Sequence, residues 1–182
     1  MSEELEVLKT VTRKLDEAKI PYVISGSIAA NYYTVPRMTR DLDVVVEMTG
    51  SDVKNFVRLF HDDFFIDEDM VRAEVDKKGM FNLIQSTYII KIDFILRKES
   101  EWQEAVFERR QKVQIDDMFI WIISPDDLIL AKLLWAKNSV SELQLNDVRN
   151  LLQSGQRLDQ EYLKKWIALL RLEEVYQKVR GC

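Results

Sequence analysis

The sequence contains very little cysteine, histidine, glycine or proline. Its 182 residues include a single cysteine, Cys182 at the end, and a single histidine, His61. An internal disulfide and a zinc site built from cysteines are therefore excluded, and no metal site is expected at His61. A reducing cytoplasm is the expected location. Because five Gly and three Pro leave little room for linkers, we predict one compact unit with a helical annex.

Long apolar runs are also missing. No run approaches the roughly 20 residues that a membrane helix requires, and the opening MSEELEVLKT is charged from its third residue onward. Neither secretion nor membrane insertion is expected. The net charge of -5 provides no overall positive field for nucleic acid, so a free nucleotide with a metal ion is the easier ligand to support.

The spacing of apolar residues predicts an α+β protein. Helical spacing is found at 3–18, 28–33, 51–60 and 102–107, and strand-like runs at 22–24, 42–46, 80–85, 88–96, 112–114 and 118–122. The charged segment 61–78 is expected to hold a short helix and exposed loops. From residue 124 the pattern is helical, over 124–135, 141–152, 159–170 and 173–179. We therefore predict an α/β core at 1–123 and a C-terminal helical region at 124–182, with Trp135 and Trp166 in the core between its helices.

An Asp-x-Asp pair begins one predicted strand. Because side chains alternate along a strand, Asp41 and Asp43 point to the same face, about 6 to 7 Å apart. Two ionised carboxylates repel one another there, and a divalent cation removes that cost. Such pairs are also common by chance, so Asp41 as a turn residue and Asp43 on a solvated face is the alternative interpretation.

Two neighbouring features support a phosphate and metal site. Gly26 and Ser27 form a turn that opens a helix, where backbone N–H groups and a hydroxyl can bind phosphate. Asp93 interrupts an apolar strand, which requires solvent or a cationic partner. Either Lys91, on the same face, is that partner, or Asp93 joins Asp41 and Asp43 at a metal site.

Together, Gly26-Ser27, Arg37-x-Thr39-x-Asp41-x-Asp43 and Asp93 resemble the DNA polymerase β-like nucleotidyltransferase superfamily. The chain is similar in particular to small stand-alone prokaryotic members related to the toxin nucleotidyltransferases of abortive-infection systems. Residues 124–133, followed by Asp147, resemble the C-terminal region of that group. The resemblance implies a mixed β-sheet flanked by helices, followed by a helical region packed on the core.

The resemblance also implies a reaction. A nucleoside monophosphate would pass from an NTP to a hydroxyl on protein, RNA or a small molecule, and pyrophosphate would leave. Gly26 and Ser27 would hold the β- and γ-phosphates, and Asp41 and Asp43 would ligate two Mg²⁺ or Mn²⁺ ions. Asp93 would ligate the catalytic ion and help to activate the acceptor.

Three further residues are candidates with open alternatives. Arg37 contacts phosphate or braces the turn before Asp41, and Lys132 reaches the triphosphate or is a surface lysine with a buried stem. Asp147 orients Lys132 or another cation, or is an ordinary acid on a helix surface.

Three functions follow from the resemblance. The leading one is a toxin-like member of a two-gene defence module with a cognate antitoxin. An antibiotic-modifying transferase is an alternative, and a non-catalytic nucleotide-binding module of the same fold is another.

Overall fold

A computed structural model describes residues 2–139 and 141–181, so Cys182 lies outside the described residues. In this part of the chain the structure has helices and strands in the following order: α1 Glu3–Ala18, β1 Tyr22–Ile24, α2 Gly26–Tyr33, β2 Asp41–Val46, α3 Val53–Phe60, β3 Phe64–Phe65, α4 Glu68–Asp76, β4 Met80–Gln85, β5 Lys91–Leu96, α5 Glu101–Arg109, β6 Gln111–Ile115, β7 Met118–Ile122, α6 Pro125–Ser139, α7 Glu142–Gln153, α8 Gln160–Leu169 and α9 Glu173–Arg180.

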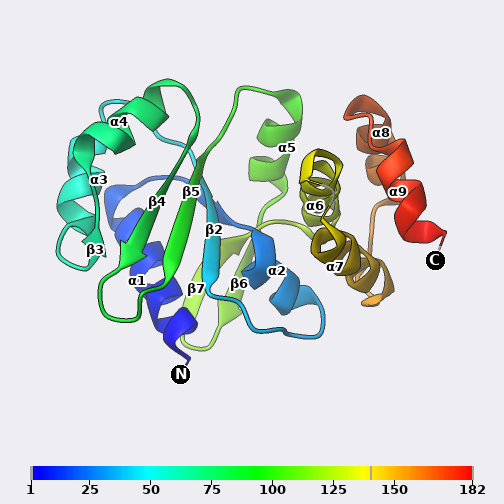
Figure 1. The fold of residues 1–182 in the computed structure, drawn as a ribbon, viewed down its shortest axis with the longest axis horizontal. Coiled ribbons are helices and arrows are strands. Elements are labelled where there is room, and N and C mark those ends of the chain that lie inside the picture. The colour runs from blue at the N-terminus through cyan, green and yellow to red at the C-terminus, as the bar shows by residue number, and fades with distance from the viewer. Residues whose placement is uncertain (1, 140, 182) are drawn as a thin grey trace.

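The strands form one mixed sheet in the order β3-β4-β5-β2-β1-β7-β6. β2 runs parallel to β5 and β1 runs parallel to β7, whereas the other neighbours are antiparallel. Helices α3 and α4 lie beside β4, and α6 to α9 stack at the other side of the molecule (Figure 1). The predicted α+β fold, a mixed sheet flanked by helices and followed by helices, is confirmed.

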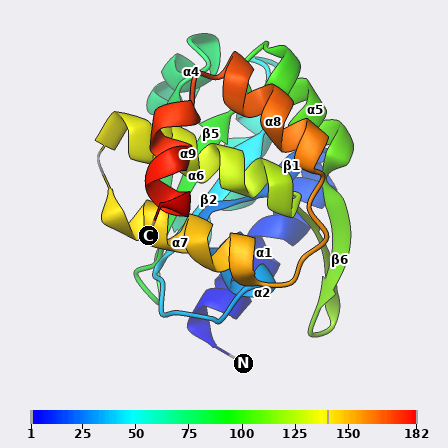
Figure 2. The same ribbon diagram turned by 90° about the vertical axis from the view of Figure 1, so that its right-hand side faces the viewer.

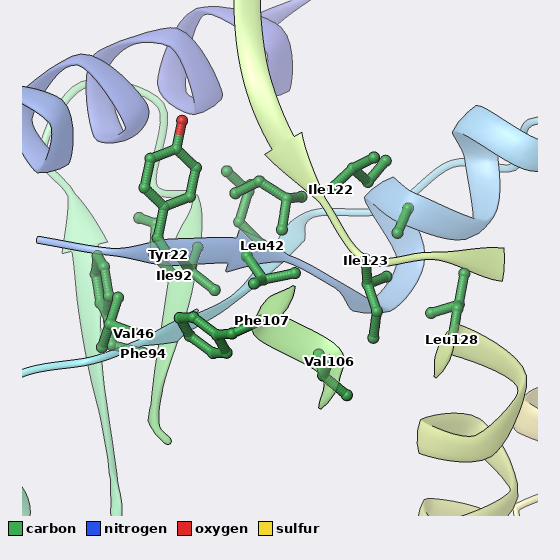
Figure 3. Packing of buried hydrophobic residues seen from close by; sticks show 14 of the residues in the cluster. Tyr22, Leu42, Val46, Ile92, Phe94, Val106, Phe107, Ile122, Ile123 and Leu128 are labelled. Atoms are coloured by element: carbon green, nitrogen blue, oxygen red, sulfur yellow. The ribbon is translucent and has the colours of Figure 1, made fainter. Parts of the chain in front are cut away.

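Strand β2 shows how the sheet separates core from site. Leu42, Val44 and Val46 are fully buried, whereas Asp41 and Asp43, on the other face, keep some exposure. Figure 3 shows Leu42 and Val46 among the buried side chains, together with Tyr22 of β1 and Ile92 of β5. A period of two therefore places apolar side chains in the core and carboxylates opposite.

A second part of the core is aromatic. Phe56 and Phe60 of α3 stack with ring centroids 4.3 Å apart, and both meet Phe94 of β5 edge-on. Phe81 of β4 stacks on Phe94 at 5.3 Å. These contacts fix β5, and with it the face that carries Asp93.

Buried acids at the start of α6 connect this helix to α5 and α8. Figure 2, the turned view, shows how α6 to α9 stack. Asp127 accepts hydrogen bonds from Trp102 Nε1 at 3.2 Å and Tyr162 Oη at 2.7 Å. Arg109 binds Asp126 at 2.9 Å and lies 3.8 Å from the centre of the Tyr162 ring. These interactions hold α5, α6 and α8 together.

Three local predictions are wrong. The strand expected at 88–96 begins only at Lys91, because Ile89 adopts a positive φ of 55° and lengthens the turn. Phe64 and Phe65 form a short strand in the segment expected to hold only a helix and loops. Trp135 is 55% exposed rather than in the core, whereas Trp166 is buried as predicted.

Within residues 2–139 and 141–181, no helix combines the length and apolar character that a membrane crossing requires.

Candidate active site

A cavity of about 550 Å³ lies between the sheet and helices α2, α5 and α6. The residues that the sequence assigned to metal or nucleotide line it together: Gly26, Ser27, Arg37, Asp41, Asp43, Asp93 and Lys132. Residues up to 106 positions apart in the sequence thus meet at one place, although their roles remain predictions.

The carboxylates are aligned by the parallel pairing of β2 and β5. Asp43 lies directly opposite Asp93, and Asp41 lies opposite Lys91. Neighbouring strands are about 4.8 Å apart, so Asp43 and Asp93 are close enough to interact strongly. Burial raises the pKa of Asp43, and the negative charges of Asp93 and Asp41 raise it further, against an opposing effect of Lys132. The site therefore concentrates negative charge that lacks full compensation.

Gly26 packs directly against this negative charge. Its φ is +58°, and a Cβ added there would stand 1.8 Å from Asp43 Oδ2. The backbone N–H of Ser25 donates to the Asp43 carbonyl at 2.9 Å, which fixes the start of α2 beside β2. The side chain of Ser25, the N-cap residue of α2, makes no capping hydrogen bond to the first turn of the helix. Its N–H groups are thus available to an anion.

The contact at Gly26 gives a prediction. Gly26→Ala is expected to lower the free energy of unfolding by more than the ~1 to 2 kcal/mol that a left-handed Ala costs, because Asp43 must also move. Gly155→Ala is the matched control, since Gly155 also has a positive φ of 76° but no heavy atom of the described chain lies within 4 Å of its Cβ position. Urea unfolding of both variants measures the difference. Equal losses would contradict a tight Gly26–Asp43 contact.

Asp93 is held by Lys91 but is not fully paired. Lys91 Nζ binds Asp93 Oδ2 at 2.7 Å, and this hydrogen bond raises the pKa of Lys91. Asp93 Oδ1 is buried and accepts no hydrogen bond from any residue that the structure describes. The ion pair that the sequence suggested between Asp93 and Lys91 is therefore present. The second carboxylate oxygen of Asp93 is available to another ligand.

The donor set fits a divalent cation only in part. In the described part of the chain, no three His, Cys, Asp or Glu side chains are arranged to hold a metal ion by themselves. Asp43 and Asp93 nevertheless face one another with a buried, unpaired oxygen and excess negative charge. Mg²⁺ is usually held by one or two carboxylates together with substrate phosphates, and these residues fit that pattern.

Arg37 and Lys132 meet at a buried acid. Asp147 is 5% exposed and binds Lys132 Nζ at 2.7 Å and Arg37 Nη2 at 3.1 Å. Burial alone would raise the pKa of Asp147, but the hydrogen bonds from Arg37 and Lys132 hold it below its usual range. Arg37 Nη2 also donates to Ser27 Oγ at 2.8 Å. Asp147 thus orients both cations, and Lys132 is a buried residue rather than a surface lysine.

The cavity also has an apolar part that the sequence analysis missed. Val45 and Ile95 line it two residues after Asp43 and Asp93, on the same strand faces. Because side chains two residues apart on a strand lie on the same face, the sequence could have predicted that Val45 and Ile95 share the face of Asp43 and Asp93. Trp135 lines the cavity as well, in place of the core position expected for it.

The fold recurs in known nucleotidyltransferases. ANT(2'')-Ia in complex with adenylyl-2''-tobramycin has a TM-score of 0.65 at 14% identity, over 95% of this chain and 99% of that one. A putative nucleotidyltransferase from Thermotoga maritima has a TM-score of 0.55 at 18% identity, over 78% and 89%. The lincosamide antibiotic adenylyltransferase LnuA, bound to lincomycin, has a TM-score of 0.55 at 13% identity, over 85% and 98%.

At these identities the likeness establishes the fold alone, which is the nucleotidyltransferase fold. A comparison with curated proteins gives no match. The family model described as a nucleotidyl transferase of unknown function (DUF2204) matches residues 4–180, and the chain therefore belongs to that family.

Proposed function

We propose that the protein transfers a nucleoside monophosphate from an NTP to a hydroxyl acceptor and releases pyrophosphate. The observation that carries the proposal is the close approach of Gly26 to Asp43. It brings an uncapped helix N-terminus, which favours phosphate, to the carboxylate face of β2. Family membership supports the same class of reaction.

Asp41, Asp43 and Asp93 would hold the Mg²⁺ or Mn²⁺ ions, with phosphate oxygens as further ligands. Two such ions, when bound, stabilise the attacking and leaving oxygens of an in-line displacement. The unpaired Oδ1 of Asp93 supports Asp93, on β5, as a metal ligand beside Asp43 on β2. The partial exposure of Asp41 at the cavity leaves it accessible to an arriving metal–nucleotide complex.

The chain's own groups divide the remaining work. Backbone N–H groups at Gly26 and Ser27 would bind the β- and γ-phosphates, and Arg37, held on Ser27, would neutralise part of their charge. Asp93 would take the proton of the acceptor hydroxyl while the oxygen of that hydroxyl forms a bond to the α-phosphorus. The bond from that phosphorus to the β-phosphate oxygen breaks, and the electron pair leaves with pyrophosphate.

The biological context is part of the proposal. We place the protein as the toxin-like member of a defence module with a cognate antitoxin, on the strength of the sequence motifs. Antibiotic modification is the second candidate, favoured by the fold likeness to proteins named as acting on antibiotics. A non-catalytic module is the least supported, because all three carboxylates are present in one cavity.

A labelling experiment tests the reaction. The protein is incubated with Mg²⁺, a cell lysate and each of the four NTPs labelled at the α-phosphate. We expect label on one class of acceptor, pyrophosphate in equal amount, and loss of both with EDTA. Nucleotide binding by calorimetry without any labelled acceptor would favour the non-catalytic module. The absence of both nucleotide binding and acceptor labelling would overturn the proposal.

A further inference from the structure

The cavity changes character along the direction of β2 and β5. At the end beside α2 its lining is polar, with Gly26, Ser27 and Arg37. Further along the two strands the lining residues become Val45 and Ile95. The same surface thus passes from carboxylates to an apolar floor within two residues of each strand.

Two helices also contribute apolar residues to the lining of the cavity. Helix α5 contributes Trp102 and Val106, and α6 contributes Trp135, which is 55% exposed. We call Val45, Ile95, Trp102, Val106 and Trp135 the apolar wall. Because α5 and α6 are held together through Asp127, the wall is a fixed part of the fold rather than a chance grouping of side chains.

The charges around the cavity restrict what can bind there. Among the described residues, the only acids that line it are Asp41, Asp43 and Asp93, all of which the proposed reaction uses for metal ions. Its basic residues are Arg37, Arg40 and Lys132. A polycationic acceptor would therefore find no carboxylate to pair with and would meet like charges, which disfavours binding.

The two ends of the cavity divide naturally between the two substrates. The triphosphate requires the N–H groups at Gly26 and the charge of Arg37, so it belongs at the α2 end. The acceptor hydroxyl requires Asp93, and the surface next to Asp93 on β5 continues into Ile95. The group that carries the hydroxyl therefore lies against the apolar wall.

We propose that the acceptor is an uncharged molecule that carries an aromatic or aliphatic group beside its reactive hydroxyl, and that the apolar wall binds this group. The inference rests on the proposed function, since it assigns the acceptor of that same site. It specifies a small neutral compound in preference to a polycation.

A matched pair of sugars tests the wall directly. Phenyl β-D-glucoside and methyl β-D-glucoside carry the same hydroxyls and differ in the apolar group, and tobramycin serves as the polycation. Equilibrium dialysis with the full chain, Mg²⁺ and a non-hydrolysable ATP analogue measures each affinity. We expect phenyl glucoside to bind about tenfold more tightly than methyl glucoside, and tobramycin to bind more weakly than phenyl glucoside.

Two variants with matched controls locate the binding. Trp135→Ala is expected to reduce phenyl glucoside affinity about threefold to tenfold, the usual range for an aromatic contact, and to leave methyl glucoside unchanged. Phe119→Ala removes another exposed aromatic, outside the cavity, and should change neither. Because Trp135 is exposed, its variant is expected to fold normally.

The second variant reverses the charge preference. Ile95→Asp is expected to weaken phenyl glucoside binding and to strengthen tobramycin binding, whereas Leu169→Asp, an exposed position outside the cavity, should alter neither. If Ile95→Asp does not fold, Trp135→Ala carries the test alone.

The outcomes separate the two proposals. Equal affinity for the two glucosides, or tighter binding of tobramycin, would overturn the inference even if pyrophosphate is released normally. Displacement of phenyl glucoside by the ATP analogue would also overturn it, because the wall would then hold the base. Failure to release pyrophosphate with a preserved glucoside preference would count against the proposed reaction and leave the assignment of the wall standing.

Discussion

Asp43→Asn is expected to reduce pyrophosphate release by about a thousandfold, which corresponds to about 4 kcal/mol of transition-state stabilisation. Asp43 faces both Asp93 and Gly26, so the substitution removes a proposed metal ligand at the centre of the site. Pyrophosphate release with saturating Mg²⁺ and NTP measures the effect. Activity near that of the unmodified protein would remove Asp43 from the catalytic set.

The same variant is expected to be more stable than the original protein when no metal is present. Burial and the neighbouring acids raise the pKa of Asp43 above its ordinary value of 3.8, so the ionised carboxylate destabilises the fold. The asparagine side chain carries no such charge, and a gain of about 1 kcal/mol is typical where an active-site strain is removed.

The pH dependence gives the sign of this effect. The folded protein binds the Asp43 proton more tightly than the unfolded chain, so the original protein loses stability as the pH rises from 3.8 to the raised pKa. The advantage of the Asp43→Asn variant is therefore fully present above the raised pKa and disappears as the pH falls below 3.8. Urea unfolding in EDTA at several pH values measures it. Asp62→Asn, at a side chain that is 91% exposed, is the control and should stay within about 0.5 kcal/mol.

Asp147→Ala is expected to lower the free energy of unfolding by about 3 to 5 kcal/mol. Lys132 is 3% exposed, and without Asp147 its ammonium group would be a buried charge that has lost its ion-pair partner and keeps a hydrogen bond to the neutral Gln144 Oε1. Asp117→Ala removes the partner of Lys9 in an exposed ion pair and should cost at most about 1 kcal/mol.

A double variant separates pairing from packing. Lys132→Met with Asp147→Leu replaces the buried charges by apolar groups of similar size and is expected to recover most of the lost stability. Arg37 is partly exposed and still bonds to Ser27, so it tolerates the change. If Asp147→Ala alone costs less than about 1 kcal/mol, Lys132 must find water in the cavity, and the orienting role of Asp147 would be wrong.

Local patterns predicted most of the fold. The alternation in β2 and the three-to-four spacing in α1 specify which face is buried, and both agree with the structure. The start of β5 was not predictable in this way, because Ile89 is a β-branched residue that takes a positive φ, a conformation usually left to Gly or Asn. A turn of this kind is imposed by the pairing of β4 with β5 rather than by its own sequence.

The candidate site was predictable in its residues but only partly in its contacts. Spacing along a strand brings Asp41 and Asp43 to one face, but the neighbour across the sheet depends on strand order, which local periodicity does not specify. The partnership of Lys132 with Asp147 depends in the same way on the packing of α6 against α7. Trp135 was misassigned because a helical period places a side chain on a face without saying what covers that face.

The pairing of Asp43 with Asp93 has a consequence for how such a protein diversifies. Their separation is set by the backbone ladder between β2 and β5, so it does not depend on the size of any side chain. The residues that border the remainder of the cavity, such as Ile95 and Trp135, project from that ladder and from α6. If the apolar wall binds the acceptor as we propose, exchanging them changes which molecules are accepted and leaves the spacing of the two acids intact. One scaffold can therefore acquire new acceptors by single substitutions without rebuilding its reactive centre.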